Sequence, residues 1–158
     1  MTPAIKIEDL NKSYGDLQAL KDINLTIEQG EFFGLLGPNG AGKSTLIGIL
    51  GGLKHKDSGS VTVLGNDVIK DYRQTKRSLG IVPQEVVFDA YFNVRETLEI
   101  QSGYFGLKNN DQNIEEVLTA LDLADKQKMN IRELSGGMKR RLLIAKALVH
   151  DPEIVVLD

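Results

Sequence analysis

Apolar and polar residues alternate along the first part of the chain, as they do in strands with one buried face. This alternation predicts strands at residues 5–10, 23–27 and 60–64. Short unbroken apolar runs predict three buried strands, at residues 31–36, 80–83 and 154–157. Pro83 ends the second of these runs and Pro152 precedes the third, which bounds both strands.

Other segments have apolar residues at the spacing that is typical of helices. We expect helices at four places: from residue 46, over 71–78, within 93–129, and from 135 to about 149. Gly103 and Gly106 interrupt the third, and Ser135 can cap the fourth. Strands before and after helices, with a helical insert between them, indicate an α/β sheet that carries a small helical subdomain.

A glycine-rich run joins the apolar run at 31–36 to the helix that follows. Its residues are Gly37-Pro38-Asn39-Gly40-Ala41-Gly42-Lys43-Ser44-Thr45. The run satisfies G-x-x-x-x-G-K-[ST], the P-loop that binds the phosphates of a nucleoside triphosphate. Strand, loop and helix is the context that this motif requires, and a glycine-rich turn before Lys-Ser by chance would rarely have it.

The residue types of this P-loop suit phosphate chemistry. Its three glycines carry no Cβ, so the backbone can turn its N–H groups inward. The helix that they open adds its dipole and its unpaired N–H groups. Lys43 is placed to bridge the β- and γ-phosphates, Ser44 to bind Mg²⁺, and Thr45 to donate to the α-phosphate.

Composition narrows the class of protein without changing this interpretation. The chain has 158 residues, 41% hydrophobic and 26% charged, which is typical of one globular domain. A net charge of −3 gives no reason to expect a nucleic-acid partner, and the absence of cysteine excludes disulfides and thiol nucleophiles. We expect no signal peptide at the start, and no apolar stretch approaches the roughly 18–20 residues of a membrane span.

Five features occur in the order and at the spacing that one family uses. They are Tyr14, the P-loop, Gln84 after Val82-Pro83, the segment Leu134-Ser135-Gly136-Gly137-Met138, and Asp158 at the end of an apolar strand. Over its whole length the chain therefore resembles the ATPase domain of ABC transporters. A P-loop by itself would also be compatible with kinases and GTPases. The family signature at residues 134–138 excludes these two classes of protein.

The resemblance implies an α/β fold of the P-loop NTPase (RecA-like) type. It implies a mixed sheet with an N-terminal antiparallel β part and a helical subdomain, incomplete at the C-terminus. The expected division is about 1–84 for the β part and P-loop core, about 85–133 for the helical subdomain, and about 134–158 for the signature helix and Walker B strand.

The same resemblance implies a role for each motif. Tyr14 would stack on adenine, and Gln84 would contact Mg²⁺ or the attacking water and report the nucleotide state to a membrane partner. Asp158 would hold Mg²⁺ through water. The alternatives are a Tyr14 that only packs on the sheet and a Gln84 that is a solvent-facing loop amide.

The signature Ser135-Gly136-Gly137 combines a hydroxyl with bare N–H groups at a helix N-terminus, which suits an anion. In the family it binds the γ-phosphate held by a second subunit, in a head-to-tail dimer; the alternative is an ordinary serine cap. Met138 departs from the commonest family form. The segment Met138-Lys139-Arg140-Arg141-Leu142 resembles exporter ATPases for drugs, lipids or polysaccharides.

The two histidines have no expected catalytic role. His55 lies in a polar turn, and His150 lies at a helix end, where a partial positive charge suits the dipole. In the family a catalytic glutamate follows the Walker B aspartate, and a switch histidine comes later. Because residues 1–158 contain neither residue, we expect this chain to bind ATP with weak or absent hydrolysis, whereas its full-length parent would be an ATPase. We also expect an uncovered sheet edge, since the family's sheet takes further strands from later residues.

The leading hypothesis is an ATP-binding subunit of an ABC transporter, cytoplasmic and peripheral on the inner face of the cell membrane. It would couple ATP binding and hydrolysis at a head-to-tail dimer to transport by a separate permease subunit. A non-transport ABC ATPase that acts on ribosomes or DNA is the alternative, although the basic face or long inserts of such proteins are not visible. A third reading takes the chain as a nucleotide-binding fragment with no catalytic role.

Overall fold

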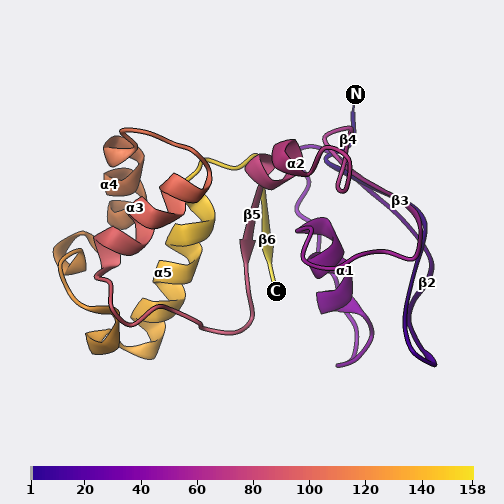
Figure 1. The fold of residues 1–158 in the computed structure, drawn as a ribbon, viewed down its shortest axis with the longest axis horizontal. Coiled ribbons are helices and arrows are strands. Elements are labelled where there is room, and N and C mark those ends of the chain that lie inside the picture. The colour runs from indigo at the N-terminus through magenta and orange to yellow at the C-terminus, as the bar shows by residue number, and fades with distance from the viewer. Residues whose placement is uncertain (1) are drawn as a thin grey trace. The chain divides into compact units, whose positions relative to one another are not determined.

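The computed structural model describes residues 2–158, which fold into two compact units (Figure 1). The first unit reaches to Ser78 and also contains Asp158. The second unit runs from Leu79 to Leu157. Among the described residues, no helix combines the length and the apolar character that crossing a membrane requires.

The first unit is built on an antiparallel sheet whose strands lie in the order β2-β1-β3-β4. These strands are β1 (Ile5–Tyr14), β2 (Leu17–Ile27), β3 (Ser58–Val63) and β4 (Asn66–Asp67). Ile5 of β1 pairs with Ile27 on one side and with Val63 on the other. Ile5, Ile7 and Val63 are buried, so the alternation in the sequence does place one face of β1 and β3 in a core.

Two helices complete the first unit, α1 (Lys43–Leu50) and α2 (Tyr72–Ser78). In α1 the side chains of Leu46, Ile49 and Leu50 are buried. The helices predicted from residue 46 and over 71–78 are thereby confirmed.

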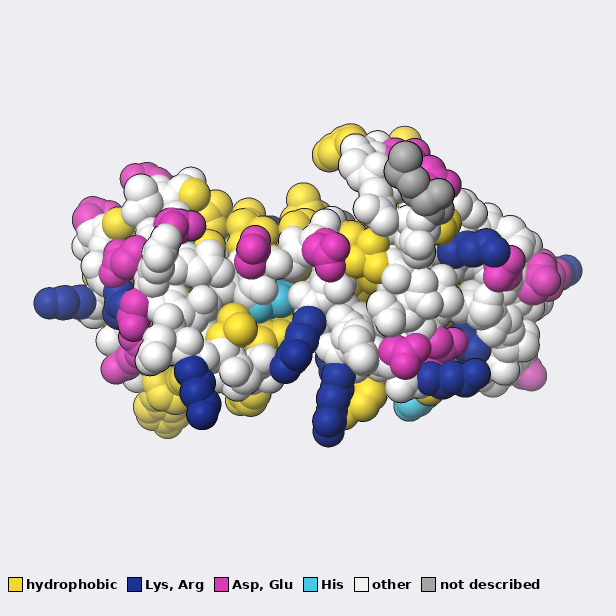
Figure 2. Space-filling model, turned by 90° about the horizontal axis from the view of Figure 1, so that it is seen from above, with side chains coloured by type: hydrophobic (Ala, Val, Ile, Leu, Met, Phe, Trp, Pro, Cys, Tyr) yellow, Lys and Arg dark blue, Asp and Glu magenta, His cyan; other side chains and the backbone are white. Residues whose placement is uncertain are grey.

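The strand predicted at residues 31–36 is wrong. In the part of the chain that the structure describes, residues 31–38 join neither sheet, and the side chains of Phe32 and Leu36 are almost fully exposed. An apolar run becomes a buried strand only when neighbouring strands take up its N–H and C=O groups, and no ladder reaches this run. Figure 2 shows that hydrophobic side chains reach the surface of the molecule.

The second unit combines a parallel strand pair with three helices (Figure 1). Strands β5 (Leu79–Val82) and β6 (Ile154–Leu157) pair in parallel, with Leu79 opposite Ile154 and Val82 opposite Leu157. The helices are α3 (Val94–Tyr104), α4 (Asp111–Ala120) and α5 (Gly136–Leu148), and two 3-10 turns, η1 (Ala124–Lys126) and η2 (Ile131–Glu133), lie between α4 and α5. The strands predicted at 80–83 and 154–157 and the helical region at 93–129 are confirmed.

The three helices pack around one apolar cluster. It includes Val94, Leu98, Ile114, Leu118, Leu123, Leu142, Ala145 and Val149. On the surface, Arg95 of α3 pairs with Glu99 of its own helix and with Asp111 and Glu115 of α4. The hydrogen bonds that the guanidinium donates, to Glu115 first and then to Asp111, raise the pKa of Arg95. The guanidinium therefore stays charged and ties α3 to α4.

Candidate phosphate and nucleotide site

The P-loop of the first unit is curled by two glycines in the left-handed region. Gly40 has φ 83° and Gly42 has φ 89°. The Ala41 N–H donates to the Pro38 carbonyl at 3.2 Å, which closes the turn before α1 begins. Within the described residues, no side chain caps the first turn of α1. The first N–H groups of this helix are therefore available to an anion.

Gly42 is also required by the strand beside it. A Cβ at this position would lie 2.4 Å from the Ala19 carbonyl oxygen and 2.8 Å from a Leu20 methyl carbon. β2 therefore fixes where the P-loop turns into α1. Among the described residues, nothing comes within 4 Å of a Cβ built at Gly40. Its positive φ alone therefore favours glycine there, whereas Gly42 also lacks space for a side chain.

The Lys43 side chain folds back over the loop from which its helix starts. Its Nζ donates to the Gly37 carbonyl at 2.6 Å and to the Pro38 carbonyl at 2.8 Å. These bonds place a full positive charge at the centre of the curled backbone. The charge, the left-handed glycines and the helix dipole together make this loop a site for a polyanion.

Ser44 and Asp158 meet although 114 residues separate them in sequence. The Ser44 Oγ donates to Asp158 Oδ1 at 3.1 Å, and both residues belong to the first unit. A hydroxyl and a carboxylate side by side suit Mg²⁺, which prefers oxygen ligands and keeps water and phosphate oxygens in its shell. Among the described residues, no cluster of three or more His, Cys, Asp or Glu could hold a metal, and Mg²⁺ bound with phosphate does not need one.

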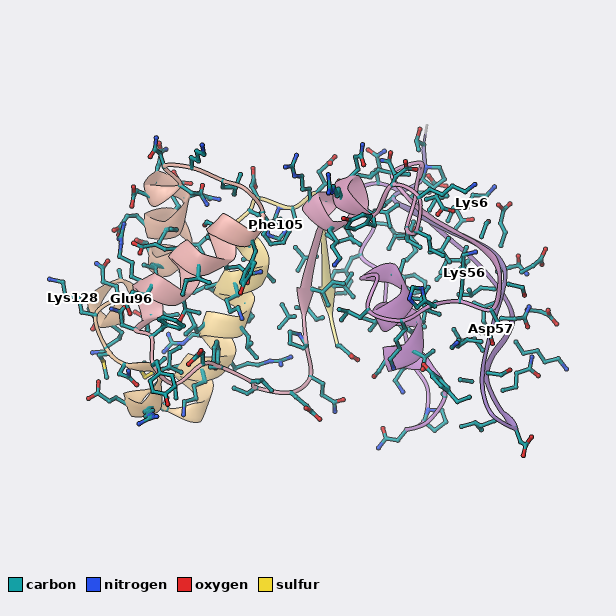
Figure 3. The ribbon with its side chains drawn as sticks, viewed as in Figure 1. Lys6, Lys56, Asp57, Glu96, Phe105 and Lys128 are labelled. Atoms are coloured by element: carbon teal, nitrogen blue, oxygen red, sulfur yellow. The ribbon has the colours of Figure 1, made fainter. Side chains whose placement is uncertain are left out.

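Tyr14 ends β1 and leaves 44% of its surface exposed. The Lys12 Nζ lies 5.2 Å from the centre of its ring, and the Lys54 Nζ lies 5.9 Å from it. Lys12 also pairs with Asp57 at 2.8 Å, and this hydrogen bond lowers the pKa of Asp57, which Figure 3 labels. Sequence reasoning missed both lysines, because only pairing of β1 with β3 brings residues 12 and 57 together.

Gln84 and the signature segment lie in the second unit. Gln84 is exposed in the loop after β5. Ser135 caps α5 as predicted, since its Oγ accepts from the Met138 N–H at 3.2 Å. Gly136 and Gly137 are exposed in the first turn, and among the described residues nothing lies within 4 Å of a Cβ built at either. The backbone N–H groups there stay open to an approaching group.

The expectation of a partial positive charge on His150 is wrong. The ring is half-buried and stacks on Phe105, labelled in Figure 3, with centroids 3.7 Å apart and planes at 7°. Its Nε2 lies 3.0 Å from the Leu79 carbonyl oxygen. Burial lowers the pKa of His150, and the Leu79 bond and Asp151 offset this only in part. Desolvation therefore outweighs the two neighbouring groups that favour the charged ring.

Comparison with known proteins identifies the family of this chain. Residues 20–158 match the family model described as ABC transporter. The chain is 42% identical over 159 residues to the Nod factor export ATP-binding protein I of Rhizobium etli, covering 98% of this chain and 50% of that protein. It is 40% identical over 156 residues to the linearmycin resistance ATP-binding protein LnrL of Bacillus subtilis, again covering 98% and 50%.

Solved structures are similar as well. The cbiO1 protein of Clostridium perfringens, part of the ABC transporter complex cbiONQ, matches with a TM-score of 0.83 and 29% identity. The match covers 100% of this chain and 66% of the cbiO1 chain. An ATP-binding subunit of an ABC transporter has a TM-score of 0.89 at 24% identity, covering 98% and 65%, which supports the fold alone. The expected P-loop NTPase fold is confirmed. The chain spans about half the length of the curated relatives that it matches.

Proposed function

This chain belongs to the family of ABC transporter ATP-binding domains, and we propose that it binds ATP with Mg²⁺ at residues 37–45. One observation carries the proposal. The P-loop is curled by Gly40 and Gly42 around the charge of Lys43, and Ser44 at its end contacts Asp158. Backbone N–H groups, a cation and an oxygen pair are what a metal-bound triphosphate requires.

Binding of ATP would rearrange the bonds of Lys43. Its Nζ would leave the carbonyls of Gly37 and Pro38 and bridge the β- and γ-phosphates, while Thr45 donates to the α-phosphate. Ser44 and Asp158 would hold Mg²⁺, which neutralises charge on the phosphate oxygens when bound. The half-exposed ring of Tyr14 would stack on the adenine.

We assign the family's coupling roles to the second unit. Ser135, Gly136 and Gly137 would bind the γ-phosphate held by a second ATPase subunit, so that ATP joins two subunits head to tail. Gln84 would respond to Mg²⁺ or to the attacking water. The open N–H groups at the start of α5 support the first role. The second role rests on the place of Gln84 directly after β5, where the family has its glutamine.

The whole protein would couple ATP hydrolysis to export through a separate membrane permease, from the cytoplasmic face of the membrane. The name of one relative, the Nod factor export ATP-binding protein I, supports export over import.

Calorimetric titration of the protein with ATP and Mg²⁺ tests the proposal. We expect saturable binding that Lys43→Ala abolishes, because its charge is the cation of the loop. Lys128→Ala is the matched control, since this exposed lysine, labelled in Figure 3, belongs to the second unit. Equal ATP affinity in Lys43→Ala and Lys128→Ala, or no saturable binding by the unmodified protein, would refute a P-loop site.

A further inference from the structure

Arg140 connects helix α5 to the loop that carries Gln84. It lies in the second turn of the helix that Ser135 caps, on the side that faces β5. Its Nη1 donates to the Pro83 carbonyl at 2.6 Å and to the Gln84 carbonyl at 3.4 Å. One guanidinium nitrogen therefore holds the main chain at the position where the strand ends and the loop begins.

The strand before this loop is packed closely on the same helix. A Cβ at Gly80 would lie 2.3 Å from the Ala147 carbonyl oxygen and 2.8 Å from the ring of Pro152. Val82, Leu143 and Ala147 form a buried apolar cluster. These contacts pack β5 closely on α5, and the carbonyls that Arg140 binds lie at the end of this packed strand.

The loop is held again four residues after Gln84. Phe88 packs against the cluster of Val82, Leu143 and Ala147, and the Lys146 Nζ lies 5.6 Å from the centre of its ring. Lys146 is partly buried there, and this burial lowers the pKa of its amine. Residues 83–88 are therefore fastened to α5 at both ends, by Arg140 and by Phe88.

We propose that Arg140 is a positioning residue, which fixes the main chain at Gln84 to the helix whose N-terminus carries Ser135. The glutamine that responds to nucleotide and the serine that binds a partner's phosphate then move as one body. This inference rests on the proposed function for the roles of Gln84 and Ser135. Arginine suits the task because its guanidinium is always charged and is less strongly hydrated than a lysine ammonium, so that it can be held against main-chain carbonyls at a lower desolvation cost.

The test is a steady-state ATPase assay of the full-length protein. Arg140→Gln should lower kcat roughly tenfold, the loss expected for one charge-assisted hydrogen bond, with the KM for ATP changed less than about threefold. Arg140→Lys should recover part of the rate. Lys128→Gln removes an exposed charge from the same unit and should leave kcat unchanged.

A double-mutant cycle separates positioning from general stabilisation. If Arg140 acts through Gln84, then Arg140→Gln should have little further effect on kcat in a Gln84→Ala background. Additive losses would overturn the inference, and so would a full rate in Arg140→Gln or in Gln84→Ala. If Arg140→Gln does not fold, the same cycle with Arg140→Lys decides, because that variant keeps the charge but replaces the planar guanidinium by a compact ammonium.

Failure of this inference can be told apart from failure of the proposed function. If Lys43→Ala still binds ATP as tightly as the unmodified protein, the P-loop site is wrong whatever Arg140 does. If Lys43→Ala and Gln84→Ala both act as expected but Arg140→Gln keeps its full kcat, only the role of Arg140 is wrong.

Discussion

Asn24 of β2 binds Asp9 of β1 twice. Its Oδ1 accepts from the Asp9 N–H at 3.0 Å, and its Nδ2 donates to Asp9 Oδ1 at 3.1 Å. Asn11 of β1 binds Asp22 of β2 in the same way, through two bonds of 3.1 Å. Both aspartates have positive φ, 48° and 46°. Two Asp-x-Asn pairs therefore bridge the hairpin at the place where its register shifts, and they satisfy groups that the ladder leaves unpaired.

We expect Asn24→Ala to lower the free energy of unfolding by about 0.5–1.5 kcal/mol, since it removes bonds to an exposed aspartate. Chemical denaturation of the protein would measure this. Thr26→Ala, at an exposed position of the same strand, is the matched control and should change stability less. Equal effects of the two substitutions would show that the Asp-x-Asn pairs contribute nothing beyond strand propensity.

Gly40 and Gly42 offer a second matched pair. Both have positive φ, so Ala at either position costs about 1–2 kcal/mol of backbone strain. Only Gly42→Ala also forces a Cβ against the Ala19 carbonyl. Thermal unfolding should show a larger loss for Gly42→Ala, with ATP affinity lost as well. A greater loss in Gly40→Ala would mean that the packing of β2 on the P-loop is not what requires the glycine.

The contact between Ser44 and Asp158 predicts how ATP affinity depends on Mg²⁺. Ser44→Ala should reduce the Mg²⁺-dependent part of that affinity roughly tenfold, because losing one Mg²⁺ ligand costs about 1.4 kcal/mol of binding free energy. The affinity for ATP without Mg²⁺ should change little. Asp158→Asn keeps an acceptor for Ser44 but removes the charge, so it should act in the same direction. Titrations with ATP in the presence and absence of Mg²⁺ measure this, and Ser58→Ala, at an exposed position, is the control. An equal fall of the ATP affinity with and without Mg²⁺ would contradict the prediction.

His150 predicts a pH dependence of stability. Because burial lowers its pKa in the folded protein below the ordinary 6.5, the unfolded chain binds a proton at higher pH than the folded protein does. Its contribution to stability is complete above about pH 6.5 and is lost as the pH falls toward the folded pKa. The Phe105 stack and the Leu79 bond would then hold a charged ring.

We therefore expect the melting temperature to fall less steeply between pH 7.5 and 5.5 in His150→Gln than in the unmodified protein. His55→Gln, which changes an exposed histidine, should keep the original slope. If the melting temperature falls equally with pH in all three proteins, carboxylates and not His150 determine the loss of stability in acid.

The sequence could predict elements whose signals are local. The P-loop needs glycines with positive φ and a lysine at the start of a helix, and Ser135 needs only the next turn as its partner. Alternation in β1 and β3 likewise predicted their buried face. Each of these features depends on bonds or sterics within a few residues, so the order of residue types suffices.

Long-range pairing decided the rest. The apolar run at 31–36 has the pattern of a buried strand, but a strand forms only beside neighbouring strands, and the local sequence does not predict those neighbours. The lowered pKa of His150 depends on the burial of a ring that stacks on Phe105, and the bond from Arg140 to Pro83 spans 57 residues. The sequence by itself determined where the left-handed glycines of the loop and the serine cap lie. Only the tertiary structure decided which distant groups surround them, because burial and carbonyl direction arise from packing and not from residue order.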